Sequence, residues 1–177
     1  MRIAVAMRAF GSAFAGSLLL LAIFASSRVA AQPAAGSERY FIEFRSRPST
    51  YIGHTYIVYG RTDATGRILD VRYAGFIPGV DAWKGLIVPV AGSVQKYEDD
   101  VLLKPDTIYG RSLTAAEYAV VARAVRMAQK TQRQWHVIFQ NCNDFAIVIA
   151  EALNMRRPPS LMPPSVWVAT LRMLNER

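Results

Sequence analysis

The sequence predicts a single α+β domain in which an antiparallel sheet packs on helices. Its 177 residues fit one compact domain, for which about 100 to 200 residues is usual. Strand-like runs joined by short turns occupy the first half of the chain, whereas the apolar patterns of the second half have helical spacing. A run of strands followed by a run of helices is typical of the α+β class. The apolar content of 52% excludes a disordered chain.

The N-terminal segment has the pattern of an export signal, so we expect residues 1–31 to be removed and the mature domain to span residues 32–177. After a basic start, an apolar run covers Gly11 to Ala25, and the small residues Val29-Ala30-Ala31 stand where signal peptidase cuts. The alternative is an uncleaved anchor, but the strongly apolar part is shorter than the about 20 residues of a membrane span. We therefore expect a periplasmic or secreted protein with no membrane span in the mature chain.

The charge of the mature chain is basic but dispersed. Loss of the signal removes three arginines and no acidic residue, so the formal net charge falls from +8 to +5. This charge suits an anionic envelope surface. The basic residues are scattered, however, and Arg156-Arg157 is the only adjacent pair in the mature chain, so we expect no nucleic-acid binding. The sequence does not indicate an oligomeric state.

Three segments early in the mature chain predict strands. They are Arg39 to Phe44, His54 to Tyr59 and Arg67 to Tyr73, which are rich in β-branched and aromatic residues. The turn residues of Gly60 to Gly66 predict a hairpin-like return between the second and third strands. Leu86 to Val90 is a fourth candidate strand. The charged stretch from Gln95 to Asp106 matches neither pattern.

The second half of the chain predicts three helices and one short strand. The first helix begins at Thr114, which has the spacing of a capping box, and ends near Gln132. Trp135 to Phe139 predicts a strand, and Phe145 to Leu153, apolar on nearly every side, predicts a buried helix. A connection with four prolines then leads to a closing amphipathic helix over Val166 to Leu174.

Cys142, the single cysteine, stands in an Asn/Asp cluster directly before the predicted buried helix. Asn141 and Asn143 are typical capping residues, so we expect the thiol at a helix N-terminus beside unpaired backbone N–H groups. The helix dipole would lower the thiol pKa, and the same N–H groups could hold the oxyanion formed when a thiolate attacks a carbonyl. The alternative is that Cys142 is a small buried apolar residue, as most free cysteines are.

A thiolate nucleophile needs a base, and His54 and His136 are the two histidines of the chain. His54 would begin a strand and could meet the end of a helix packed across the sheet. His136 would precede Cys142 on the incoming strand. We favour His54, because a base on a separate rigid element can face a helix-terminal sulfur directly. One cysteine and two histidines argue against a thiolate or histidine metal site, and no cofactor is predicted.

Two strings of residues resemble the circularly permuted papain-fold group, whose branches include the PPPDE isopeptidases, permuted NlpC-like hydrolases and lecithin retinol acyltransferase relatives. The strings are Gly53-His54-Thr55-Tyr56-Ile57-Val58 and Phe139-Gln140-Asn141-Cys142-Asn143-Asp144-Phe145-Ala146. In this group the histidine strand precedes the cysteine helix, as it does here. The resemblance implies a permuted papain-like (NlpC-like) fold with the cysteine at the N-terminus of a buried helix.

The resemblance also implies roles for individual residues. Cys142 would be the nucleophile and His54 the general base, with a thioester intermediate. Papain-like enzymes draw a third residue, which orients the imidazole, from the strand after the histidine strand, and Asp70 is the charged candidate there. The alternatives are a solvent-facing Asp70 and a dyad without a third residue. Asn141 and Asn143 are expected to set the helix start rather than to react.

The substrate implied by the resemblance and by export is an envelope amide, such as a peptidoglycan stem peptide. Acyltransferase relatives carry a second histidine shortly after the first, and this chain has none there. The sequence therefore predicts an exported thiol amidase or peptidase. A non-catalytic envelope binding module on the same scaffold and a lipid acyltransferase that uses the same thioester are the alternatives.

Overall fold

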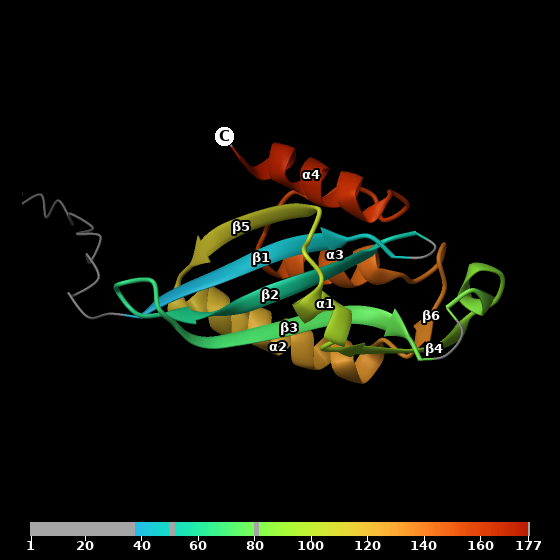
Figure 1. The fold of residues 1–177 in the computed structure, drawn as a ribbon, viewed down its shortest axis with the longest axis horizontal. Helices are drawn as coiled ribbons and strands as arrows, with labels where there is room; N and C mark the ends of the chain where they lie inside the picture. The colour runs from blue at the N-terminus through green and yellow to red at the C-terminus, as the bar shows by residue number, and fades with distance from the viewer. Residues whose placement is uncertain (1–37, 50–51, 80–81, 177) are drawn as a thin grey trace, which may run out of the picture. The chain divides into compact units, whose positions relative to one another are not determined.

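Six antiparallel strands form one sheet in the residues that the computed structural model describes, which are 38–49, 52–79 and 82–176 (Figure 1). The order across the sheet is β5-β1-β2-β3-β4-β6. In chain order the strands are β1 (Arg39–Arg47), β2 (His54–Thr62), β3 (Ile68–Pro78), β4 (Val90–Gln95), β5 (Thr107–Leu113) and β6 (Gln134–Trp135). The predicted export signal, residues 1–31, lies outside the described residues.

Four helices complete the described part of the chain, together with the short 3-10 turn η1 (Lys84–Leu86). They are α1 (Glu98–Leu102), α2 (Ala115–Thr131), α3 (Cys142–Ala152) and α4 (Pro164–Asn175). Figure 1 shows α2 and α3 behind the sheet and α1 in front of it. The predicted α+β class with an antiparallel sheet packed on helices is thus confirmed. None of the described helices combines the length and apolar character that a bilayer crossing requires.

The core lies between the sheet and the three longer helices. α3 packs on β2 and β3, and α4 packs on β1 and β5. Alternate residues of the strands point into this layer, as the period of a strand requires. The largest fully buried side chains include Phe44, Ile57, Phe76, Phe145 and Trp167. Since every residue of this core lies between positions 42 and 171, the unit Pro33–Arg177 has a hydrophobic core of its own.

The helix predicted from Thr114 is confirmed with its cap. The hydroxyl of Thr114 accepts the backbone N–H of Glu117 at 3.1 Å, and the Glu117 carboxylate accepts the Thr114 N–H at 2.8 Å. The helix ends at Thr131, one residue before the predicted Gln132. The first three predicted strands, the buried helix and the closing helix are also present and longer than predicted, although β3 begins one residue later and α3 ends one residue earlier than expected.

The predicted strand over Leu86 to Val90 is wrong, because this segment is mostly a turn. The N–H groups of Ile87 and Val88 both donate to the Lys84 carbonyl, at 2.9 Å each. Their β-branched side chains have high strand propensity, but none of the described strands pairs with them, and local hydrogen bonds decide the backbone. The strand β4 begins only at Val90, where it pairs with Trp135.

The predicted strand over Trp135 to Phe139 ends at its first residue. His136 and Gln140 exchange backbone hydrogen bonds of 2.9 and 3.1 Å, so the chain reverses between them. The strand β5 was not predicted, although Tyr109 and Leu113 alternate with exposed residues on it. Gly110 and the polar residues around it dilute the apolar signal, and pairing with β1 makes this segment a strand.

Candidate active site

Cys142 is the first residue of α3, and a reciprocal cap holds the start of that helix. The side-chain oxygen of Asn141 accepts the N–H groups of Asn143 and Asp144 at 2.8 and 3.4 Å. The Asp144 carboxylate accepts the Asn141 N–H at 2.8 Å. The cap uses these N–H groups and leaves the N–H of Cys142 outside it. The predicted capping role of Asn141 is therefore confirmed, and the thiol lies at a helix N-terminus as expected.

Asn143 ties the cysteine helix to two other segments. Its side-chain oxygen accepts the Thr55 hydroxyl at 2.6 Å, which joins α3 to β2 one residue beyond His54. Its amide nitrogen donates to the carbonyl oxygens of Ser160 and Met162 at 2.8 Å each. The side chain is buried and fully bonded. The expected capping role of Asn143 is wrong, because Asn141 is the N-cap and the Asn143 side chain bonds to Thr55, Ser160 and Met162. Asn143 instead sets the spacing between the strand with the histidine and the helix with the cysteine.

The structure brings His54 and Cys142 together. Both are buried, with 7% and 3% of their surfaces exposed, and the imidazole and the thiol lie close enough for each to shift the pKa of the other. His54 begins β2, and its ring stacks on Tyr56 of the same strand face, with 6.0 Å between the ring centroids. The strand therefore holds the imidazole in a fixed position.

The Asp100 carboxylate lies beside the imidazole. The distance from His54 Nε2 to Asp100 Oδ2 is 3.6 Å, slightly longer than a hydrogen bond. Both atoms are buried, and neither has a hydrogen-bond partner among the described residues. Two buried polar atoms that face each other across this gap need only a small movement to bond, and apo sites often show such loose geometry.

Arg47 anchors Asp100. Its Nε donates to Asp100 Oδ1 at 2.7 Å, with both side chains almost completely buried. The guanidinium also lies 5.3 Å from the ring centroid of Tyr97, and Ser46 hydrogen-bonds the Asp106 side chain. The segment that carries α1 is thereby attached to the end of β1 at several points. This attachment explains why a helix of five residues can hold a carboxylate at a fixed position.

The electrostatics of the site favour a thiolate–imidazolium pair. Burial alone lowers the pKa of His54, but the neighbouring Asp100 carboxylate and Cys142 raise it from 6.5 to about 9. Burial alone raises the pKa of the Cys142 thiol. The interaction with His54 and its charge outweigh this effect of burial and lower the pKa of the thiol below its ordinary value. The backbone N–H groups of Thr55 and Asn143 lower it further.

Gly75 on β3 makes room for the imidazole. A Cβ atom at this position would lie 2.5 Å from His54 Nε2 and 3.2 Å from the Tyr56 Cβ. We predict that Gly75→Ala displaces the ring from Cys142 and slows alkylation of the thiol by iodoacetamide at pH 7 by about tenfold or more. Gly110→Ala is the matched control for a general effect of replacing glycine, because Gly110 also lies in a strand and its added Cβ would come closest to the flexible Glu43 side chain, at 3.2 Å. Equal alkylation rates in Gly75→Ala and in the unchanged protein would contradict this account of the glycine.

Two cavities meet at Cys142. The first has a volume of about 630 Å³, and its lining includes Ile52, Ile138, Leu161 and Met162. The second, of about 610 Å³, contains His54 and is lined on one side by the segment from Gln95 to Leu103. The charged stretch without a clear sequence pattern is therefore a wall of the cleft. A substrate that spans both cavities would place its reacting bond at the thiol.

The structure does not bring Asp70 to His54, so the predicted orienting role of Asp70 is wrong. Asp70 pairs across the sheet with Arg61, and the seven residue steps from His54 to Arg61 span about 23 Å of extended strand. Its carboxylate accepts instead from Arg72 at 3.0 Å and from the Tyr118 hydroxyl at 3.3 Å. Because β2 and β3 are antiparallel, the early residues of β3 lie beside the far end of β2.

His136 is occupied elsewhere. Its Nδ1 accepts the backbone N–H of Ile138 at 3.0 Å, and its ring packs on Phe139 with 4.6 Å between centroids. It therefore stabilises the turn after β6. The prediction that His136 lies on an incoming strand is wrong. Of the two histidines, the one on the separate element is the one that meets the thiol.

Sequence reasoning missed Asp100 and Arg47. One signal was present, because Glu98-Asp99-Asp100 is the only run of adjacent acidic residues in the chain. Nothing in the sequence showed which of these carboxylates would be buried. No group of His, Cys, Asp and Glu in residues 38–49, 52–79 and 82–176 has an arrangement that could hold a metal ion.

Comparison of the chain with protein-family models, with curated proteins and with solved structures finds no match. The chemistry of the site therefore follows from its geometry alone. A thiol, an imidazole and a carboxylate in series, at the junction of two cavities, are the components of a nucleophilic acyl-transfer site.

Proposed function

We propose that this chain is an exported thiol hydrolase, an amidase or peptidase, with Cys142 as nucleophile, His54 as general base and acid, and Asp100 as the orienting residue. The observation that carries the proposal is the buried imidazole between the thiol and a carboxylate that Arg47 holds in place. A buried cysteine of purely structural function needs no such partner, and this series of groups is the arrangement that activates a nucleophile.

The proposed reaction has two steps. The Cys142 thiolate attacks the carbonyl carbon, and the backbone N–H of Cys142 stabilises the oxyanion. The C–N bond then breaks, the imidazolium of His54 gives its proton to the leaving amine, and a thioester remains. A water molecule attacks the thioester while His54 takes its proton. The C–S bond breaks, the acid leaves, and the thiolate–imidazolium pair forms again.

The order of the elements supports a permuted papain-like fold for this proposal. The strand with His54 precedes the helix with Cys142, and antiparallel strands lie between the strand and the helix in sequence. With the predicted export signal, this makes an envelope amide such as a peptidoglycan stem peptide the substrate that we propose. The proposed location is the periplasm or the exterior of the cell.

One observation favours a second candidate function, lipid acyl transfer through the same thioester. About half of the residues that line the first cavity beside Cys142 are aliphatic residues and prolines, and Arg47 and Asp106 are the charged residues of its described lining. Such a lining suits an acyl chain as well as an apolar amino-acid side chain. Mass spectrometry of Cys142 after incubation with stem peptides or with phospholipids separates the two functions by the mass of the trapped acyl group.

The pH dependence of thiol alkylation tests the proposed hydrolase. An ordinary thiol with a pKa of about 8.5 is less than about 5% ionised at pH 7. Because the pKa of Cys142 is lowered and that of His54 is raised to about 9, the ion pair persists between the two values. We expect alkylation by iodoacetamide to begin at a lower pH than that of an ordinary thiol, and hydrolysis that declines as the pH rises through about 9, where the imidazolium loses its proton. Alkylation that follows a single ionisation at pH 8.5 or above would contradict the proposal.

A further inference from the structure

Two neighbouring loops expose large apolar side chains at the end of the sheet where β4 and β6 pair. We call these side chains the apolar tip: Trp83, Ile87, Val88, Ile138 and Phe139. Phe139 and Ile87 are the most exposed, at 76% and 71%. The N–H of Val137 donates to the Gly85 carbonyl at 3.1 Å and so joins the two loops. Exposed apolar groups that cluster in this way mark an interaction site more often than scattered ones do.

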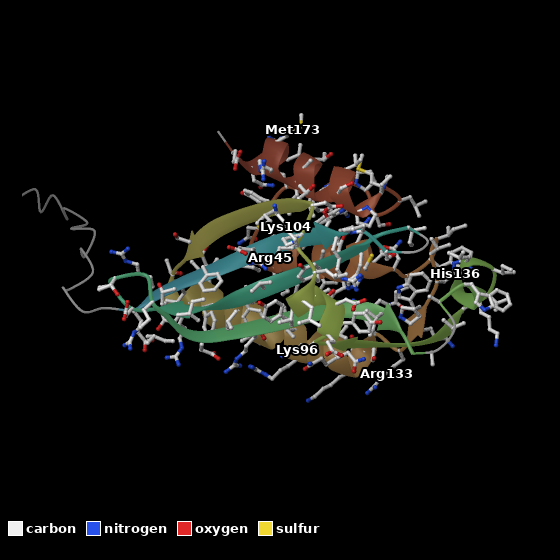
Figure 2. The ribbon with its side chains drawn as sticks, in the orientation of Figure 1. Arg45, Lys96, Lys104, Arg133, His136 and Met173 are labelled. Atoms are coloured by element: carbon white, nitrogen blue, oxygen red, sulfur yellow. The ribbon has the colours of Figure 1, made fainter. Side chains whose placement is uncertain are left out.

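A row of cations runs along α2 toward the apolar tip. We call it the basic row: Arg123, Arg126, Lys130 and Arg133. The spacing of three and four residues places Arg123, Arg126 and Lys130 on one face of the helix, over about 10 Å, and Arg133 follows two residues after the helix ends at Thr131. All four are exposed, and none forms a salt bridge with a described carboxylate. Figure 2 shows Arg133 at the lower edge of the molecule, below the sheet.

The basic row ends at Arg133, next to the strand pair that carries the loops of the apolar tip. The carbonyl of Arg133 accepts the N–H of Gly92 at 2.9 Å, and two residues later Trp135 pairs with Val90. The loop with Ile87 leads directly into this strand pair. The acidic residues that border Phe139 are already engaged, because Glu151 pairs with Arg157 at 2.9 Å and Asp144 caps α3.

We propose that the apolar tip and the basic row dock the protein on an anionic phospholipid bilayer, with the apolar tip in the headgroup region and the basic row over lipid phosphates. Aromatic and aliphatic side chains beside cations are the combination that interfacial binding uses. An anionic polymer would engage the cations but would leave the apolar tip in water. A second copy of the chain would bring like charges together. Ile138 belongs to both the tip and the larger cavity, so docking would bring the cleft close to the membrane surface.

Co-sedimentation with vesicles tests the docking proposal. The protein, residues 32–177, is mixed with vesicles of phosphatidylcholine alone or with about one third phosphatidylglycerol. We expect binding to the anionic vesicles that weakens as salt is raised. Arg126→Gln with Lys130→Gln is expected to weaken binding about 25-fold, since each cation near the surface contributes about fivefold. Ile87→Ser with Phe139→Ser is expected to weaken it about tenfold or more.

Matched controls lie at the far end of the sheet. Arg39→Gln and Ile68→Ser remove an exposed cation and an exposed aliphatic side chain beside Thr62, and we expect unchanged vesicle binding. Equal binding by all variants would overturn the proposal. Vesicle binding that depends on the cations alone, with equally strong binding to soluble polyphosphate, would also overturn it. Self-association of the protein that Phe139→Ser abolishes would overturn it as well. Alkylation of Cys142 stays at the rate of the unchanged protein in these variants, so the hydrolase proposal is tested separately.

Discussion

Replacement of His54 by glutamine is expected to reduce hydrolysis by about 10²- to 10⁴-fold, the contribution of a general acid–base group. The thiol would lose both the interaction with the imidazole and the positive charge that lower its pKa, while the burial that raises this pKa would remain. Alkylation of Cys142 at pH 6 should therefore nearly cease, because an ordinary thiol is less than about 1% ionised there. Alkylation over a pH series, followed by mass spectrometry of the cysteine peptide, measures this effect independently of the substrate.

His136→Gln is the matched control for this substitution. It removes the other histidine of the chain, whose Nδ1 bonds only within the turn after β6 in the described structure. The turn loses one hydrogen bond, so a loss of stability of about 1 kcal/mol is expected, with no change in the alkylation rate. If His54→Gln and His136→Gln slowed alkylation equally, the thiol would not depend on the imidazole that the structure places beside it.

Replacement of Asp100 by alanine is expected to lower the free energy of unfolding by about 3 to 5 kcal/mol. Asp100 and Arg47 are both buried, and the substitution leaves the guanidinium without its closest carboxylate, since Asp99 is 3.8 Å away and half exposed. Urea denaturation measures this loss. Asp99→Ala is the control for general effects on α1, and we expect it to cost less than about 1 kcal/mol, as is usual for an exposed ion pair.

A double variant separates the structural part of Asp100 from its effect on the imidazole. Asp100→Leu with Arg47→Met removes both buried charges and should recover much of the stability lost in Asp100→Ala. The pKa of His54 should nevertheless fall in both variants, because the carboxylate that helps to raise it is gone. The alkaline limit of hydrolysis should then move to lower pH. Stability that recovers together with an unchanged alkaline limit would show that Asp100 only holds the fold.

The elements with strong local signals were predictable. The capping box at Thr114 and the Asn/Asp cluster around Cys142 act within a few residues, so the sequence alone places the start of α2 and brings that of α3 to within three residues, since the helix begins at Cys142 and not at Phe145. The fourth strand failed because Ile87 and Val88 have high β propensity but pair with none of the described strands. β5 failed for the opposite reason, since pairing with β1 outweighs a weak local pattern.

The sequence by itself determined the chemical groups available to the site, the helix N-terminus that holds Cys142, and His54 on a separate element as its partner. Only the tertiary structure decided the third group. Asp70 was expected from its place on the next strand, but antiparallel pairing carries it away from His54. Asp100 lies 46 residues from His54 in a short helix, and its burial depends on Arg47 from β1. Contacts between distant segments of this kind leave no periodic trace in the sequence, because each partner alone resembles an ordinary surface charge.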